Sequence, residues 1–368
     1  MTDRIDLKSE IEKAVSFAAR QLHRLATDYP DQFPTFTLGG KWSFQDRSWT
    51  QWTEGFVGGQ FWLIYQLTGN EWFRKQAEKY CLLIESRKTD HTVHDLGFLF
   101  WPTWKRRYDF SGDPAHNQVV VEAGRTLAKR FQSPGGYLCS FQGPESLYID
   151  IMMNVGLVFY AADQDQDESL QEIACRHCLT TRRRLVRGDG STAHEGIFNP
   201  ETGAFLKQTT RQGWRNDSTW ARGLTWALYG FGTAFDFSGD IRFLNTAELI
   251  AGYYMEHTPQ GSIPPNDWDE PAPEIHFESS AAAIAACGLY RLSKLVKDPA
   301  QADRYATHAL KTLQTLLTPD FLALEMPEWK GILKHGIYHK PAQVGVDEST
   351  IWGDYYFLEL LSLVLQES

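Results

Sequence analysis

Two carboxylates stand at the start of long apolar stretches of the sequence. Asp150 lies in SLYIDIMMNVGLVFY and Asp95 in HDLGFLF, each beside aromatic residues. An ionised carboxylate among apolar side chains is costly unless it is paired or used. One structural explanation is a carboxylate that binds the free N–H groups at a helix N-terminus. Because two such carboxylates open two apolar stretches, the pattern favours a paired acid/base site.

Basic side chains accompany these carboxylates. His94 directly precedes Asp95, and His194 lies in the loop sequence GDGSTAHEGIFNPETG. A loop position needs no polar side chain for structure unless something uses it. Both histidines are therefore candidates for contact with a ligand. Arg222 in DSTWARGLTW could bind a carboxylate or hydroxyl groups, or it could form a structural ion pair.

Composition and charge narrow the function classes. The formal net charge is −10, which argues against nucleic acid as a partner. No apolar run approaches the ~20 residues of a membrane helix, and the charged N-terminal sequence lacks the apolar core of a secretory signal. We therefore expect a cytoplasmic protein without a membrane partner. The spacing of the cysteines, and of His91 and His94, completes no metal site, and nothing requires a cofactor.

Two kinds of helix are expected to position these residues. The first kind is amphipathic and begins at an Asn or Asp that can cap a helix, with Pro114 and Pro299 suited to the first helical position. A segment over residues 11–25 is of the same amphipathic kind. The capping residues are Asn70, Asp113, Asp167, Asp240 and Asp298.

The second kind of helix is apolar on nearly all faces and rich in Gly and Ala, as a helix that packs on several sides requires. Six such segments alternate with the amphipathic ones. They begin near Trp52, His94, Tyr148, Asp217, Phe277 and Thr350.

This alternation predicts an all-α fold, an (α/α)6 toroid with six inner and six outer helices. An open solenoid of helix pairs is the alternative. The polar and aromatic residues concentrate at the starts of the inner helices, and these starts converge at one end only if the barrel closes. Since no Pro/Gly/Ser-rich linker divides the chain, we expect residues 1–368 to form a single catalytic domain.

The residues at these helix starts resemble glycoside hydrolase family 88, the unsaturated glucuronyl hydrolases. The resemblance runs in order from Trp52 to about Leu360. Its motifs are WTEGF (52–56), HDLGF (94–98), DIMMN (150–154), H-x3-F-x-PETG (194–203), Gln212-Gly213, DSTWARG-x2-W (217–226), PP-x-D (264–267), ESSAAAIAA (278–286) and VDES-x-IWGDYYFLE (346–359).

The resemblance implies an activity and a role for each matching residue. Enzymes of this family hydrolyse the unsaturated uronic acid from the non-reducing end of oligosaccharides that polysaccharide lyases produce. Asp150 matches the catalytic acid/base and Asp95 the second essential acidic residue. The residues that it places against the substrate are Trp52, His94, His194, Gln212, Trp220, Arg222 and Trp226.

This chain departs from the family pattern in two places. Phe141 stands where the family often has Trp, which would weaken one stacking wall. Family members that prefer 6-sulfated substrates carry a Ser-x-x-Ser-x-Lys pattern in the last loop. This chain has His339-Lys-Pro-Ala-Gln-Val344 there. A sulfate preference by that route is therefore not expected.

The chemistry of such a substrate explains the residue set. Its C4=C5 double bond is joined to the ring oxygen, so the sugar is a vinyl ether. Protonation at C4 leaves positive charge on C5 and the ring oxygen, water adds at C5, and the hemiketal opens and expels the remaining chain. One carboxyl that gives and then takes a proton suffices, unlike the two opposed carboxyls of ordinary glycosidases. We expect the apolar setting of Asp150 and the nearby Asp95 to raise the pKa of this proton donor.

Three other functions fit parts of the pattern. The same reaction on a pectin fragment, by an unsaturated rhamnogalacturonyl hydrolase, is the nearest one. A sugar epimerase on the same barrel would use a pair of histidines as acid and base. A carbohydrate-binding protein would lack Asp95 or Asp150, and both are present. The sequence makes no prediction about the source polysaccharide or the oligomeric state.

Overall fold

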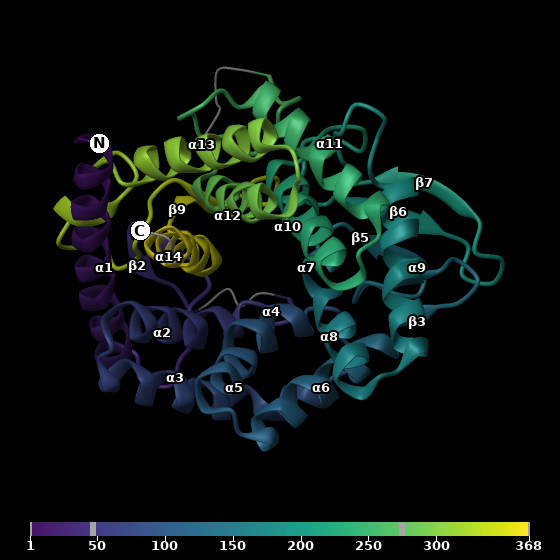
Figure 1. Cartoon of the computed structure of the whole chain (residues 1–368), viewed down its shortest axis with the longest axis horizontal. Helices are drawn as coiled ribbons and strands as arrows, with labels where there is room; N and C mark the ends of the chain where they lie inside the picture. The colour runs from purple at the N-terminus through teal and green to yellow at the C-terminus, as the bar shows by residue number, and fades with distance from the viewer. Residues whose placement is uncertain (1, 45–48, 272–276, 367–368) are drawn as a thin grey trace.

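An outer layer of helices surrounds an inner one over residues 2–44, 49–271 and 277–366, the part of the chain that this computed structural model describes, with side chains described from residue 7 onward (Figure 1). The outer helices alternate along the sequence with the inner ones. They are α1 (Thr2–Asp28), α3 (Glu71–Ile84), α6 (Pro114–Ala128), α9 (Glu168–Arg184), α11 (Ile241–His257) and α13 (Pro299–Leu316).

Five of the outer helices begin at the predicted capping residues. In each case the Asn or Asp side chain accepts a hydrogen bond from a backbone N–H of the first turn. Pro114 and Pro299 occupy the first helical position, where a missing N–H costs nothing. The helix starts predicted for the outer layer are therefore confirmed.

The inner layer consists of six helical segments that are mostly buried, apart from residues 105–111 of the second. Consecutive segments contact one another, and the last contacts the first, which closes the ring. The segments are α2 (Glu54–Thr68); α4 (Leu96–Phe100), continued by the π-helix η2 (Trp101–Lys105) and α5 (Arg106–Ser111); α7 (Ile151–Asn154) with α8 (Gly156–Asp165); α10 (Ala221–Ser238); α12 (Ser279–Leu295); and α14 (Ile351–Leu365). The fold is the (α/α)6 toroid that the alternation predicts, and the solenoid is excluded.

Glycine in the inner helices permits this close packing. A Cβ on Gly55 of α2 would lie 2.2 Å from the Phe98 carbonyl oxygen of α4. A Cβ on Gly230 of α10 would lie 2.4 Å from the Met152 carbonyl oxygen of α7. Neither approach is compatible with a larger residue unless the backbone shifts.

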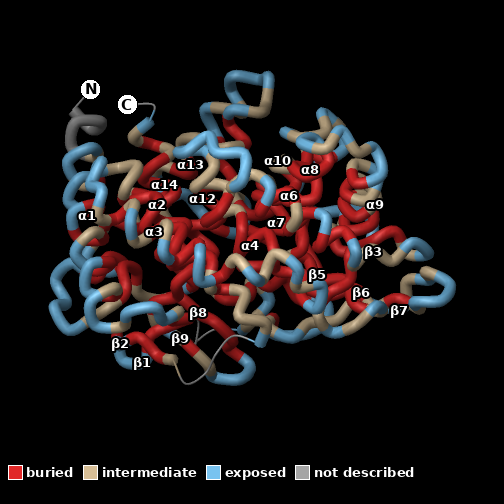
Figure 2. The backbone as a smooth tube through the Cα atoms, turned by 90° about the horizontal axis from the view of Figure 1, so that it is seen from below, coloured by how far each residue is buried: buried red, intermediate tan, exposed pale blue. Residues whose placement is uncertain are grey.

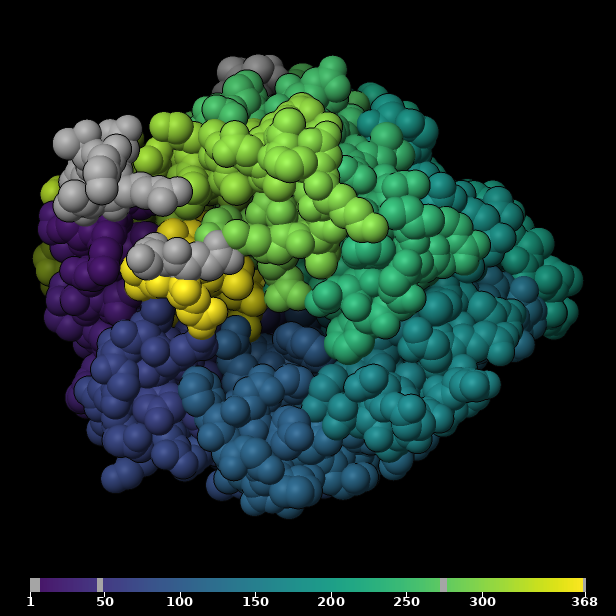
Figure 3. Space-filling view, in the orientation of Figure 1, coloured from purple at the N-terminus to yellow at the C-terminus, as the bar shows by residue number. Residues whose placement is uncertain are grey.

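Short antiparallel strands were not predicted, and they gather toward one end of the barrel (Figure 2). Strands β5, β6 and β7 form a three-stranded sheet, and the others pair as β1–β2, β3–β4 and β8–β9. Figure 3 views the opposite end, where α2, α12 and α14 pack around the centre. The strands and single turns are β1 (Thr37–Leu38), β2 (Lys41–Trp42), η1 (Glu85–Thr89), β3 (Phe131–Gln132), β4 (Tyr137–Leu138), β5 (Ser146–Tyr148), β6 (Glu195–Phe198), β7 (Phe205–Thr209), η3 (Ala323–Glu325), β8 (Gly336–His339) and β9 (Val344–Glu348).

Candidate active site

A cavity of about 430 Å³ is lined by residues that precede or begin the inner helices. All ten residues singled out from the sequence line it: Trp52, His94, Asp95, Phe141, Asp150, His194, Gln212, Trp220, Arg222 and Trp226. The other eight lining residues were not predicted to be site residues; they are Trp49, Thr50, Phe98, Gln142, Tyr148, Thr210, Arg211 and His339. Thr210 and Arg211 directly precede Gln212, so chain proximity was the one available signal for them.

The two carboxylates occupy helix N-cap positions but do not cap. Asp95 precedes α4 and Asp150 precedes α7, and neither side chain accepts a hydrogen bond from its helix. Asp95 is 3% exposed, and its Oδ2 accepts a hydrogen bond of 2.6 Å from the Thr50 hydroxyl. Asp150 Oδ1 is buried without a hydrogen-bond partner among the described residues. The structural explanation by helix capping is therefore wrong for both.

His94 turns one ring nitrogen toward both carboxylates. The Phe141 backbone N–H donates to His94 Nδ1 at 3.1 Å, so this nitrogen carries no proton. The proton must then sit on Nε2, which lies 3.3 Å from Asp95 Oδ1 and 3.8 Å from Asp150 Oδ2. One N–H thus lies close to both acids.

The pKa values of the two acids move in opposite directions. Burial raises the pKa of Asp95 above its usual value, and the nearby Asp150 adds to the rise. Burial is also the largest influence on Asp150, but the nearby imidazoles of His94 and His194 together outweigh it, so its pKa is lowered. The expectation of a raised pKa at Asp150 is wrong for the unliganded protein, because two imidazoles face its carboxylate.

His194 is held in the same tautomer by a different loop. The backbone N–H groups of Arg211 and Gln212 approach its Nδ1 at 3.2 and 3.4 Å, so Nε2 carries the proton and faces the cavity. Burial lowers the pKa of His194 to about 4, and the imidazole is neutral near pH 7. Both histidines are therefore hydrogen-bond donors to a ligand rather than bases.

Arg222 forms the structural ion pair that the sequence left open, and it also orients a neighbour. Its Nη1 lies 3.6 Å from a carboxylate oxygen of the buried Glu278 and donates to the Ile337 carbonyl. Its Nη2 donates to Gln212 Oε1 at 2.6 Å and to the Tyr338 carbonyl at 2.8 Å. Since Oε1 of Gln212 accepts from Arg222, the amide N–H groups of Gln212 remain for a ligand.

Aromatic rings form the walls of the cavity. Phe141 lies parallel to His94 with ring centroids 5.8 Å apart, and the Trp220 ring is 4.5 Å from the His194 ring. Trp52 packs 4.9 Å from Trp352 and is partly open, whereas Trp226 is only 1% exposed. Trp226 therefore lines the cavity with a ring that is otherwise packed in the core.

Buried polar atoms without a hydrogen-bond partner concentrate in this cavity. Such atoms are rare in folded proteins and mark places where a ligand or water completes the bonding. Among the described residues that line the cavity they are His94 Nε2, Tyr148 Oη, Asp150 Oδ1, His194 Nε2, Trp220 Nε1 and Arg222 Nε. Five of the six are nitrogen or hydroxyl donors, a set that suits a polar ligand rich in oxygen.

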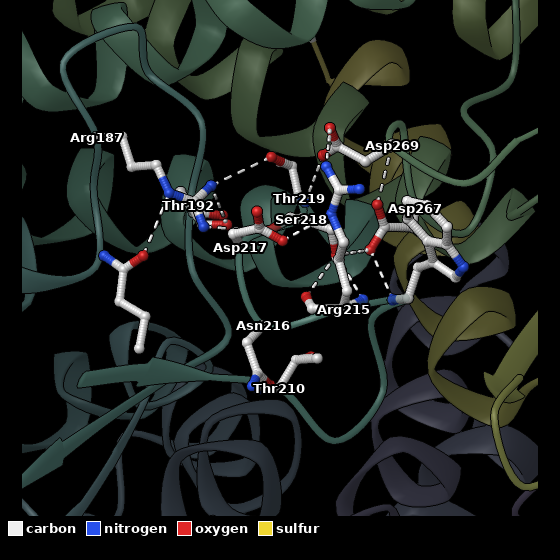
Figure 4. Close-up of polar contacts among 12 residues, drawn as sticks. Arg187, Thr192, Thr210, Arg215, Asn216, Asp217, Ser218, Thr219, Asp267 and Asp269 are labelled. Carbon is white, nitrogen blue, oxygen red and sulfur yellow. Dashed lines mark hydrogen bonds and ion pairs between the residues drawn. The ribbon is translucent and has the colours of Figure 1, made fainter.

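The loop that carries Gln212 is fixed by a polar network (Figure 4). Asp267 accepts hydrogen bonds from the Trp214 backbone N–H at 2.9 Å and the Ser218 hydroxyl at 2.6 Å. Arg187, from outside the loop, donates to the Ser218 carbonyl and the Thr219 hydroxyl. On the other side of Gln212, the Thr210 backbone N–H donates to Asn216 Oδ1 at 3.2 Å, so hydrogen bonds hold the loop on both sides of Gln212.

Two further features of the described part of the chain concern metal ions and membranes. No group of three or more His, Cys, Asp or Glu side chains there could hold a metal ion. None of the helices in residues 2–44, 49–271 and 277–366 is long and apolar enough to cross a membrane.

A closed double ring of helices with this acidic, donor-rich cavity at one end defines a helical-barrel glycoside hydrolase. The family model of Glycosyl Hydrolase Family 88 matches residues 22–250, and the chain belongs to that family. It is 32% identical to an unsaturated glucuronyl hydrolase of Bacillus sp. strain GL1, over 95% of this chain and 94% of that one. It is 30% identical to an unsaturated chondroitin disaccharide hydrolase of Streptococcus agalactiae, over 98% of this chain and 93% of that one.

Solved structures agree with this assignment. The crystal structure of the Bacillus sp. unsaturated glucuronyl hydrolase superposes with a TM-score of 0.90 at 30% identity, covering 95% of this chain and 96% of that one. A mutant of the Streptococcus agalactiae enzyme in complex with dGlcA-GalNAc6S gives a TM-score of 0.84 at 29% identity, covering 98% and 93%. The family resemblance and the enzyme class expected from the sequence are confirmed.

Proposed function

We propose that this chain removes the 4,5-unsaturated uronic acid from the non-reducing end of lyase-generated oligosaccharides. The observation that carries the proposal is the Asp150 carboxylate in the cavity. It does not cap its helix, and its Oδ2 lies 3.8 Å from His94 Nε2. The relatives named above are a glucuronyl and a chondroitin disaccharide hydrolase, so the pectin alternative is not favoured. Residues 1–368 act as one catalytic domain.

The reaction is a hydration of the double bond. Asp150 gives its proton to C4, and the positive charge that develops is shared by C5 and the ring oxygen. Asp150 then takes a proton from a water molecule as the water oxygen bonds to C5. The resulting hemiketal opens and releases the remaining oligosaccharide, so atoms and protons balance without a cofactor. Asp95 and Asp150 share one side of the cavity around His94, whereas ordinary glycosidases need carboxyls across the scissile bond.

Asp150 acquires its proton when substrate binds. In the unliganded protein its pKa is lowered, and the carboxylate is ionised at neutral pH. The substrate brings a second carboxylate and expels water, and both effects raise the pKa of a neighbouring acid. Asp95 holds the His94 N–H on its other side and tunes how strongly that donor stabilises ionised Asp150.

The other cavity residues bind and orient the sugar. His194 and Gln212 present N–H donors to its hydroxyl and carboxylate oxygens, and Arg222 supplies a buried positive charge behind Gln212. Trp52, Phe141, Trp220 and Trp226 shape the walls. An epimerase that uses two histidines as acid and base is disfavoured, because backbone N–H groups occupy Nδ1 of both. We place the reaction in the cytoplasm, where the five free cysteines stay reduced.

A labelling experiment tests the reaction itself. Turnover of an unsaturated disaccharide in heavy water should place one deuterium on C4 of the released uronic acid, as read by mass spectrometry and NMR. The matched saturated disaccharide should not be cleaved, because it has no double bond to protonate. Unlabelled C4, or efficient cleavage of the saturated sugar, would contradict hydration.

A further inference from the structure

Two arginines of the same loop are used in opposite ways. Arg215 lies outside the cavity, and its guanidinium is engaged by Asp217 at 2.6 Å and Asp269 at 3.9 Å (Figure 4). Arg211, four residues earlier, lines the cavity. Arg215 therefore forms ion pairs outside the cavity, whereas Arg211 is available to the cavity.

Arg211 is anchored on one edge of its guanidinium. Its Nε lies 3.4 Å from Oε2 of Glu195, a residue of β6 that is 1% exposed. The other oxygen of Glu195 accepts a hydrogen bond of 2.6 Å from the Ser146 hydroxyl of β5. Burial raises the pKa of the Tyr148 hydroxyl, and the neighbouring Arg211 opposes that rise. A cation fixed in this manner is oriented before a ligand arrives, which lowers the entropy cost of binding it.

Arg211 also lies at the mouth of the cavity rather than at its floor. The Arg211 side chain is 50% exposed, and Trp49 on the cavity lining is 61% exposed. His94 and Asp95 at the floor are 1% and 3% exposed. An unsaturated uronic acid bound at the floor beside Asp150 would leave the next sugar toward the mouth, the part of the cavity that Arg211 lines.

The other cations near the cavity are not open to a ligand in this way. Arg222 is 1% exposed and directs both Nη groups to protein acceptors. Lys340, beyond the lining residue His339, lies 2.7 Å from Glu270. Arg211 is thus the open arginine of the two that line the cavity among the described residues.

We propose that Arg211 forms an anion subsite that takes a sulfate ester on the sugar next to the unsaturated uronic acid. A guanidinium fork offers parallel N–H donors that match two oxygens of a sulfate group. Sulfate is the common anionic substituent of uronic-acid polysaccharides besides the uronate itself. This inference rests on the proposed function and adds a specificity-determining residue to it.

The test compares substrates and variants in one cycle. The wild type, Arg211→Gln, Arg211→Lys and Arg215→Gln are assayed on the unsaturated chondroitin disaccharide without sulfate and with a 4- or 6-sulfate. The readout is kcat and KM from the loss of the double bond's ultraviolet absorbance. Arg215→Gln is the matched control, because it removes an arginine of the same loop outside the cavity.

Arg211→Gln should raise KM for one sulfated disaccharide about five- to tenfold more than it raises KM for the unsulfated one. Arg211→Lys should lose less, and added salt should shrink the difference. Equal changes on sulfated and unsulfated substrates, or the same pattern in Arg215→Gln, would overturn the subsite. If Arg211→Gln fails to fold, Arg211→Lys decides by the same comparison. Failure of the wild type on the unsulfated disaccharide would count against the proposed function instead.

Discussion

Carboxylates at helix starts behave differently in the two layers of the barrel. At the outer helices, Asp113, Asp167, Asp240 and Asp298 each accept a backbone N–H of the first turn. At the inner helices α4 and α7, Asp95 and Asp150 hold the same position and accept none. The same residue type at the same position is a cap in one layer and is free for chemistry in the other.

Two further inner-layer acids show that burial alone does not explain this difference. Glu278 caps α12 and pairs with Arg222, and Asp354 in α14 accepts the backbone N–H groups of Ile332 and Leu333. Both are 0% exposed, and their carboxylate oxygens are engaged by the protein. What separates Asp150 from them is therefore its unpartnered oxygen at the floor of a cavity, not its depth.

Asp150→Asn should produce the largest effect. The amide keeps the shape of the side chain but cannot transfer a proton, so kcat should fall by about 10²–10⁴-fold while the melting temperature stays nearly unchanged. The matched control is Asp113→Asn at an outer cap, which should change neither quantity because Asn caps as well as Asp. Retention of more than a few per cent of kcat would remove Asp150 from the acid/base role.

Asp354→Asn should change how stability depends on pH. Burial raises the pKa of Asp354 from 3.8 to about 7, so the folded protein keeps a proton that the unfolded chain has released. This contribution to the free energy of unfolding is complete below about pH 4 and is lost as the pH rises toward 7. Each pKa unit corresponds to about 1.4 kcal/mol, so the effect is on the order of a few kcal/mol.

The measurement for Asp354 is the melting temperature of wild type and variant between pH 4 and pH 8. The advantage of the wild type over the variant should shrink as the pH rises toward 7 and then level off. Parallel curves across this range would mean that Asp354 is ionised in the folded protein and differs little from an outer cap.

Asp298→Ala should produce the smallest effect and complete the comparison. This outer cap accepts the Ala300 backbone N–H at 2.9 Å, and its loss should lower the free energy of unfolding by about 1 kcal/mol. Denaturant titration measures this loss, and kcat should be unchanged. A fall in kcat without a fall in stability would mean that outer caps also support the cavity.

The order of helices could be read from the sequence because its signals are local. A cap is a contact between residues two or three positions apart, so Asn70 or Asp298 predicts its helix without knowledge of the rest of the fold. The short strands could not be predicted, because strand pairing joins residues that are far apart in the sequence. Strand β5 pairs with β6 from about fifty residues away, and strands of two to five residues leave little periodic pattern in the sequence.

Membership of the cavity could also be predicted, since the polar residues before inner helices must converge once the ring closes. The tautomers of the histidines and the ionisation of Asp150 could not be predicted from the sequence. The tautomer of His94 depends on the Phe141 backbone, and that of His194 on the backbone of Arg211 and Gln212. These contacts decide that Asp150 is ionised in the unliganded protein, against the expectation from its apolar neighbours in sequence.

The sequence by itself thus determined the alternating helices, their caps, the family and the ten residues that meet in the cavity. Only the tertiary structure decided which nitrogen of each histidine carries a proton, which way the pKa of Asp150 moves, and which of two loop arginines lines the cavity. The physical reason is the distance along the chain over which each interaction acts. Helix periodicity and capping act within a few residues of the chain, whereas hydrogen bonding and electrostatics in a cavity depend on ångström distances between segments that only the fold brings together.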